Sequence, residues 1–84
     1  MFVARVYVTL KTGVNDPQGL TIKGGLQQLG FETVEDVRAG KFFEIRINEE
    51  SKGHASEAVG GMCEQLLANK VIEDYRFELQ PVTG

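Results

Sequence analysis

The amino-terminal segment is the strongest constraint on the fold, because an apolar side chain recurs there at every second position. Over residues 2–10 one side of the segment carries only apolar residues. A period of two is the spacing of a β-strand that buries one face. The segment is therefore predicted to be a strand, and the rest of the chain has to supply a layer that covers it. The opposite side of this strand carries Val3, Arg5, Tyr7 and Thr9.

Two later segments follow a helical period instead. Asp16 and Pro17 form a typical helix start, because a carboxylate can cap the first turn and proline is favoured at the first helical position. Gly30 is a typical stop, so the first helix is predicted over residues 17–29. A second apolar face at helical spacing predicts another helix over residues 55–68.

Three further strands are predicted, over residues 33–38, 41–48 and 71–80. The first two flank Ala39 and Gly40, a spacing that fits a two-residue hairpin turn. Alanine is a poor occupant of a position with positive φ, so a bulge or a longer loop is the alternative at that point. Each predicted strand can bury one side and leave the other open to solvent or to a partner.

The resulting order is strand, helix, strand, strand, helix, strand, which is two halves of the same βαβ form. Two right-handed crossovers make a ferredoxin-like sandwich the simplest packing for a single domain over residues 1–84. The predicted fold is therefore α+β: a two-layer sandwich with a four-stranded antiparallel sheet and both helices on one face. Exchange of strands between neighbouring chains, or extension of the sheet in an oligomer, would leave the same sequence pattern.

The size of the chain points to association as a source of stability. A domain of 84 residues buries only about 60% of the surface that its unfolded chain exposes. Disulfides cannot compensate, since Cys63 is the only cysteine, and a single thiol fits a reducing, intracellular setting. A metal site is not expected either, because the one histidine, His54, has no obvious second ligand. Oligomerisation is the remaining option.

Charge and hydropathy exclude several function classes. The formal net charge is −3, with nine Lys and Arg against twelve Asp and Glu, so nucleic-acid binding is not expected. No apolar run approaches the length of about 20 residues that a membrane span needs, and no signal-peptide pattern precedes Phe2. The chain is expected to be cytoplasmic, without a membrane partner.

Residues that could carry catalysis have simpler explanations. Cys63 lies on the apolar face of a predicted helix, where it is best read as a small core residue. The glycine pairs at residues 24–25 and 60–61 do not belong to a phosphate-binding loop, and they indicate the close approach of another backbone in helix packing. No catalytic, cofactor-binding or metal-binding residue is therefore predicted in this chain.

The open face of the sheet is the most informative feature, because two helices cannot cover it. It mixes apolar and charged side chains, as a subunit interface does, although a solvated face with cross-strand ion pairs is the alternative. Arg38 and Lys41 flank the predicted turn as a basic tip, which either meets an acidic partner or keeps the turn soluble. The predicted interface on this face comprises Val3, Arg5, Tyr7, Phe42, Arg46 and Arg76, with Glu44 and Glu78 among them.

Three segments with specific residues carry a family resemblance. They are residues 16–19 (DPQG), 36–41 (DVRAGK) and 66–75 (LLANKVIEDY), and the opening strand contributes VYVTLK at residues 6–11. With these segments in this order and spacing, nearly the full length of the chain resembles the PurS family of phosphoribosylformylglycinamidine synthase subunits.

The resemblance implies a role in purine biosynthesis, in the conversion of formylglycinamide ribonucleotide to its amidine. It implies that PurS is not the catalyst and binds no cofactor, while ATP, Mg²⁺ and glutamine are used by the PurL synthetase and PurQ glutaminase subunits. PurS is implied to dimerise and to bridge these two partners, so that ammonia passes between their sites. The basic tip and the region from Asp74 to Arg76 are then expected to touch the larger subunits.

Three other classes remain open from the sequence alone. An ACT-like regulatory domain that binds small molecules at an interface has the same order of elements. An RNA-binding sheet would use aromatic residues where Tyr7 and Phe42 stand, but the acidic balance argues against it. An acylphosphatase would need an arginine in the loop after the first strand, and residues 12–19 contain none.

Overall fold

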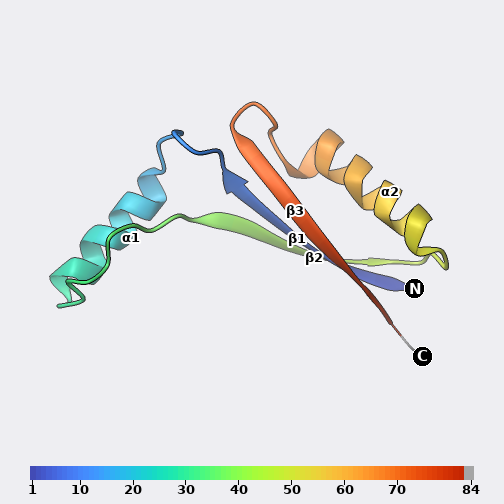
Figure 1. The fold of residues 1–84 in the computed structure, drawn as a ribbon, viewed down its shortest axis with the longest axis horizontal. Helices are drawn as coiled ribbons and strands as arrows, with labels where there is room; N and C mark the ends of the chain where they lie inside the picture. Colours follow the sequence, from blue (N-terminus) through green and yellow to red (C-terminus); the bar gives the residue numbers. More distant parts are fainter. Residues whose placement is uncertain (83–84) are drawn as a thin grey trace.

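The computed structural model describes residues 1–82 as a three-stranded sheet with two helices, one of which stands away from it (Figure 1). No helix among these residues combines the length and apolar character needed to cross a membrane. The elements in chain order are β1 (Phe2–Leu10), α1 (Pro17–Gln28), β2 (Gly40–Ile47), α2 (Lys52–Met62), the π-helical turn η1 (Cys63–Leu67) and β3 (Glu73–Pro81).

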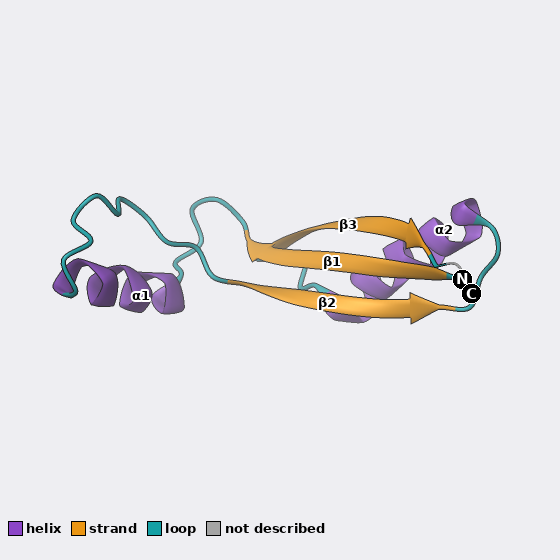
Figure 2. Cartoon of the chain, turned by 90° about the horizontal axis from the view of Figure 1, so that it is seen from below, coloured by secondary structure: helices purple, strands orange, loops and turns teal. Residues whose placement is uncertain are grey.

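The sheet has the order β2-β1-β3, with β1 in the centre and both neighbours antiparallel to it (Figure 2). Val6 of β1 lies opposite Phe43 of β2 and Phe77 of β3, and this register places apolar residues of all three strands on one face. The predicted α+β class, antiparallel sheet and two helices are confirmed.

The core lies between that face and α2. Val6 and Val8 of β1 pack with Val59 of α2 and Cys63 of η1, and all four side chains are almost completely buried. Apolar residues of β2 and β3 complete this layer from the sides while remaining half-buried. The alternation in β1 therefore produces the expected result: one face enters the core, and the other stays open.

The predicted strand over residues 33–38 is wrong, and so is the hairpin turn at Ala39 and Gly40. Residues 33–39 contain no helix or strand and run back along α1, where Gln27 Nε2 donates to the Val34 carbonyl at 3.2 Å. The tight primed turns of hairpins need positive φ, and neither Ala39 nor Gly40 has it. Gly40 instead begins β2, which pairs with β1.

The prediction that both helices pack on the sheet is also wrong for the single chain. Only α2 covers it, while α1 lies beyond its end, so that the molecule measures 49 × 31 × 14 Å (Figures 1 and 2). The Cα radius of gyration is 16.4 Å. A compact domain of this length would have a radius of about 12 Å. The chain is therefore elongated, with a separate helical limb.

Local capping explains where the helices begin and end. Asp16 caps α1 by accepting a hydrogen bond from the Gly19 amide, and Gly30 follows the helix with φ of +102°, both as predicted. The second helix begins at Lys52, earlier than predicted, because Ser51 Oγ caps it through the His54 amide. Strand β3 begins at Glu73, because the preceding residues form a closed turn.

Candidate functional site

The open face of the sheet brings together residues from all three strands. In the register, Tyr7 lies between Phe42 and Arg76, and Arg5 lies between Glu44 and Glu78. The face also includes Val3 and its neighbours Arg46 and Gln80. Asp74 lies opposite Thr9 on the same side, so the structure places seven of the predicted interface residues on one surface. Their role as an interface stays a prediction.

Aromatic contacts form the centre of this open face. The rings of Tyr7 and Phe42 have centroids 5.3 Å apart and are tilted by 42°. The guanidinium carbon of Arg76 lies 4.0 Å from the centroid of the Tyr7 ring, within the range of a cation–π contact. Phe42 keeps 53% of its surface exposed. The centre of the face is therefore ordered by its own contacts and still offers an aromatic ring to a partner.

Charged groups surround this centre. Arg76 pairs with Glu78 at 3.2 Å, and Arg5 Nη1 donates to Gln80 Oε1 at 2.6 Å. Arg46 Nη2 contacts the sulfur of Met1 at 3.5 Å, and it has no carboxylate within 4.0 Å among the described residues. The three arginines of the open face are matched by three acidic residues, Glu44, Glu78 and Asp74, so its charges balance. It therefore suits a partner surface that carries charged groups of both signs.

The hairpin turn that Arg38 and Lys41 were predicted to flank is absent, and each of the two side chains has a partner within the chain. Arg38 Nη2 donates to the carbonyls of Leu10 and Lys11 at 2.9 and 3.3 Å, which ties the end of β1 to the start of β2. Lys41 pairs with Glu73 at 3.6 Å. The sequence could not show this, since it depends on which strands become neighbours.

Asp16 joins the first two sequence motifs. Its Oδ1 accepts a hydrogen bond from the Gly19 amide at 2.9 Å, and its Oδ2 accepts one from the Ala39 amide at 2.8 Å. The guanidinium Nε of Arg38 lies 3.9 Å from the same Oδ2. The two backbone donors are the main cause of the lowered pKa of Asp16, and the charge of Arg38 acts in the same direction against desolvation. We call this set of contacts the Asp16 clamp.

The third motif forms the turn before β3. The carbonyl of Asn69 accepts hydrogen bonds from the Ile72 and Glu73 amides, and Glu73 Oε1 accepts one from the Asn69 amide at 2.7 Å. Asp74, predicted to touch a partner, pairs with Lys11 at 3.3 Å but keeps 67% of its side chain exposed. The geometry of this turn is thus held by one asparagine and one glutamate.

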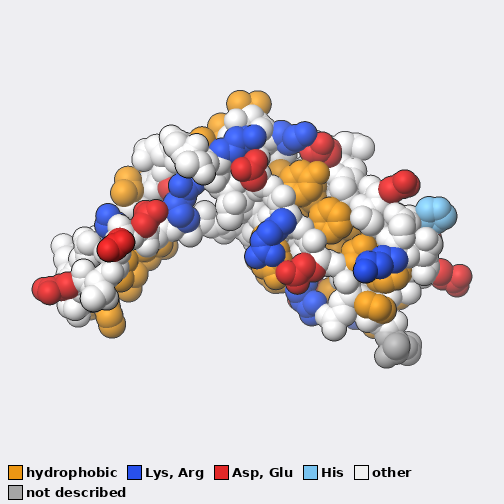
Figure 3. Space-filling view, viewed as in Figure 1, with side chains coloured by type: hydrophobic (Ala, Val, Ile, Leu, Met, Phe, Trp, Pro, Cys, Tyr) orange, Lys and Arg blue, Asp and Glu red, His pale blue; other side chains and the backbone are white. Residues whose placement is uncertain are grey.

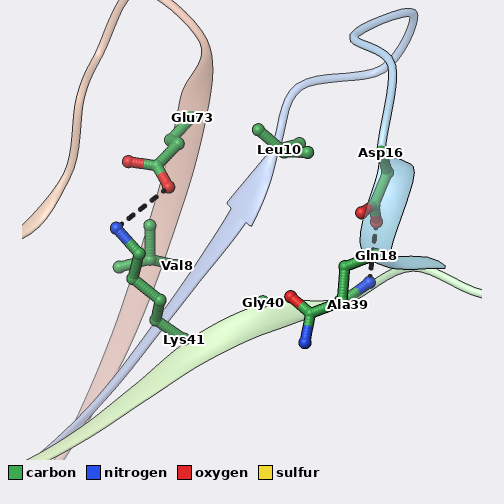
Figure 4. Close-up of a pocket in the computed structure, with 8 residues that line it drawn as sticks. All are labelled: Val8, Leu10, Asp16, Gln18, Ala39, Gly40, Lys41 and Glu73. Carbon is green, nitrogen blue, oxygen red and sulfur yellow. Dashed lines mark hydrogen bonds and ion pairs between the residues drawn. The ribbon is translucent and has the colours of Figure 1, made fainter.

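The three motifs meet around a small cleft of about 170 Å³ (Figure 4). Figure 4 shows the Lys41–Glu73 ion pair on one side and the bond from Asp16 to the Ala39 backbone on the other. The carboxylates of Asp16 and Glu73 already have partners, so the cleft serves as a structural junction. The lining residues are Val8, Leu10, Asp16, Gln18, Ala39, Gly40, Lys41 and Glu73.

Groups suited to chemistry are scarce in the described part of the chain. Burial raises the pKa of the Cys63 thiol, which lies in the core and is therefore a poor nucleophile. Within residues 1–82, no group of three or more His, Cys, Asp or Glu side chains is arranged to hold a metal ion. The open sheet face and the exposed side of α1 remain candidate interaction surfaces.

Comparisons with known proteins agree along the length of the chain. The family model PurS, described as phosphoribosylformylglycinamidine (FGAM) synthase, matches residues 3–81. The phosphoribosylformylglycinamidine synthase subunit PurS of Bacillus subtilis is 46% identical over 84 residues, which cover 100% of this chain and 99% of that protein.

Two solved structures show the same fold. The crystal structure of Methanocaldococcus jannaschii PurS, described as one of the subunits of formylglycinamide ribonucleotide amidotransferase, superposes with a TM-score of 0.89 at 40% identity, covering 99% of this chain and 100% of that one. A chain in the structure of PurLQS from Thermotoga maritima superposes with a TM-score of 0.85 at 31% identity, covering 95% and 99% of the two chains.

Proposed function

Since this chain belongs to the PurS family, we propose that it is the small, non-catalytic subunit of phosphoribosylformylglycinamidine synthase in purine biosynthesis. The observation that carries this proposal is the full-length similarity to a chain found in a PurLQS assembly. In this role the chain bridges the PurL synthetase and PurQ glutaminase subunits and supports the transfer of ammonia between them. ATP, Mg²⁺ and glutamine are used by those partners.

The chemistry of the described residues supports a role in assembly. The one thiol is buried, and the motif carboxylate of Asp16 is occupied by backbone amides. The specific motifs therefore maintain a shape, while the exposed aromatic and arginine side chains of the open sheet face supply contacts. Neither the family match nor the relatives support the ACT-like alternative.

The surface assignment follows from which side chains are free to meet a partner. Val3, Arg5, Tyr7, Phe42, Arg46 and Arg76 form the proposed interface on the open face. Lys41 and Asp74 remain proposed contacts for the larger subunits, because their side chains are 60% and 67% exposed despite their ion pairs. Arg38 contributes indirectly, by holding β1 and β2 in place.

Light scattering during size-exclusion chromatography tests the proposal. The chain is measured alone and mixed with the synthetase and glutaminase subunits from the same source. We expect an oligomer that joins both partners, and glutamine-dependent product formation only in the full mixture. A chain that remains separate from both partners would overturn the bridging role.

A matched pair of variants tests the open face. Phe42→Asp places a charge at the centre of this face and should prevent assembly. Ala58→Asp introduces the same charge at an exposed residue of α2, outside the three motifs, and it should leave assembly unchanged. Equal behaviour of the two variants would reject the open face as the interface.

A further inference from the structure

The π-helical turn η1 exposes a leucine that a regular helix would bury. In an α-helix Leu66 would follow Cys63 by three residues and share its buried side. The Ala68 amide instead donates to the Cys63 carbonyl at 3.0 Å, which is the wider hydrogen bond of a π-helical turn. This turn rotates Leu66 away from the core, so that Leu66 is 83% exposed while Cys63 and Ala68 are buried. The backbone of η1 therefore presents an apolar side chain to solvent.

The turn after η1 presents a second apolar side chain in a fixed position. Val71 is 83% exposed, and the neighbouring Ile72 is 39% exposed. The Val71 amide donates to Asn69 Oδ1 at 3.2 Å, and the Ile72 carbonyl accepts a hydrogen bond from the Lys11 amide at 2.8 Å. Because these bonds order the backbone beside Val71, a partner that binds here pays little further conformational entropy. We call residues 66–72 the exposed segment.

Ion pairs border the apolar side chains of the exposed segment. Lys70 Nζ lies 2.8 Å from Glu64 Oε1, and Lys11 Nζ lies 3.3 Å from Asp74 Oδ1. Apolar side chains within a charged border are typical of the surface where two proteins meet. The border carries two charges of each sign, so it suits a protein surface that pairs with both signs and fixes the orientation of binding.

The exposed segment continues into residues already proposed to contact the larger subunits. Glu73 closes the turn by accepting the Asn69 amide, and it pairs with Lys41 at 3.6 Å. Lys41 and Asp74 are proposed contacts for those subunits. The turn before β3 lies at the top of the arch that the chain forms in Figure 1. Figure 3 shows hydrophobic side chains at this upper edge, next to Lys or Arg side chains.

The size of the exposed segment decides which kind of partner fits it. A standard interface buries roughly 800 Å² and about 20–30 residues on each side. The exposed apolar side chains of residues 66–72 are too few to provide this area, so the segment cannot hold two copies of the chain together by itself. It suits one part of a wider contact, with a partner that also covers Lys41 and Asp74.

We propose that the exposed segment anchors the chain to a larger subunit of the synthase, with Leu66 and Val71 in an apolar pocket of that subunit. The bordering ion pairs of Lys70 and Lys11 lie at the rim of this contact. The proposal rests on the proposed function, in which the chain bridges two larger subunits, and it names an anchor for that bridge. It also gives a reason for the π-helical turn, which directs Leu66 outward.

Polar replacements of similar shape test the anchor. Leu66→Gln with Val71→Thr keeps the net charge, the helix propensity at residue 66 and the branched side chain at residue 71. The dissociation constant for the larger subunit should rise at least about tenfold, because two anchor side chains become polar. Leu66→Met with Val71→Ile remains apolar and should bind like the parent chain. Ala58→Gln is the control, since it adds the same amide at an exposed position of α2.

Titration calorimetry of each variant with the synthetase subunit, the glutaminase subunit and both together measures the binding. Sedimentation equilibrium measures self-association, and circular dichroism confirms folding. Weaker binding of the polar variant to at least one larger subunit, with unchanged self-association, supports the anchor. Equal binding of all variants overturns it. Weaker self-association of the polar variant also overturns it, because a second copy then covers the segment. A parent chain that joins neither subunit refutes the bridging role and the anchor together.

Discussion

Replacing Gly40 with alanine should destabilise the fold, although the residue lies at an exposed strand end with ordinary backbone angles. An added Cβ would lie 2.5 Å from the Val8 carbonyl oxygen and 3.1 Å from Thr9 Cγ2. The nearest atom belongs to the backbone of the central strand, so it cannot move aside as a flexible side chain would. Either β2 separates from β1 at this end, or β1 shifts within the core.

The expected loss of stability follows from other overpacked sites, where added atoms lower the free energy of unfolding by about 1–3 kcal/mol. For a domain of this size, a loss of 1 kcal/mol lowers the melting temperature by about 4–8 °C. Gly40→Ala should therefore melt at least about 4 °C below the parent chain. Gly24→Ala is the matched control, because its Cβ would meet nothing within 4 Å. Gly24→Ala should raise the free energy of unfolding by about 1 kcal/mol, because alanine has a higher helix propensity than glycine.

Urea unfolding followed by circular dichroism measures both effects, at one fixed protein concentration because association contributes to stability. The slope with denaturant should stay the same, so that the midpoints alone report the change in stability. A Gly40→Ala chain as stable as the parent would refute the close approach of β2 to Val8. A loss of stability in both variants would show instead that the two sites are equally crowded.

Three further results are expected. The pKa of Asp16 is lower in the folded chain than its usual value of 3.8, so the ionised carboxylate stabilises the fold at pH values above 3.8. This stabilisation is lost as the pH falls through the pKa of the folded chain. Asp16→Asn should therefore remove part of the loss of stability at acid pH, as measured by urea unfolding from about pH 2 to pH 6. The buried Cys63 thiol should react with Ellman's reagent only after unfolding, and rapid labelling of the folded chain would contradict its burial. Arg76→Ala should lower the free energy of unfolding by about 0.5–1 kcal/mol, because the cation–π contact with Tyr7 is lost. Arg46 makes no such contact with a ring among the described residues, so Arg46→Ala should lower the free energy of unfolding by less in the same assay.

Local chemistry determined much of what could be predicted. The alternation in β1 identified both the buried face and the open face, because side chains on a strand point to opposite sides at every step. Asp16, Pro17 and Gly30 marked the ends of α1, since capping depends on neighbouring residues and needs no tertiary partner. Ser51 is an equally local signal for the start of α2, and the start predicted at residue 55 is wrong because this serine caps the helix earlier.

Tertiary structure decided the conformation of residues 33–38, the direction of the Arg38 side chain and the position of α1, which the sequence could not predict. The segment predicted as a strand over residues 33–38 instead runs back along α1, where Gln27 binds the Val34 carbonyl, and it ends where Asp16 Oδ2 accepts a hydrogen bond from the Ala39 amide. No periodic pattern in the sequence records such contacts. Arg38, predicted on a solvent-facing tip, is directed by the meeting of β1 and β2 toward the Leu10 carbonyl. The sequence by itself thus determined the family, three strands, both helices and the two faces of the sheet. Only the folded chain decided that the motifs form a junction and that α1 stands free, because side-chain bonds to distant backbone groups depend on which segments pack together.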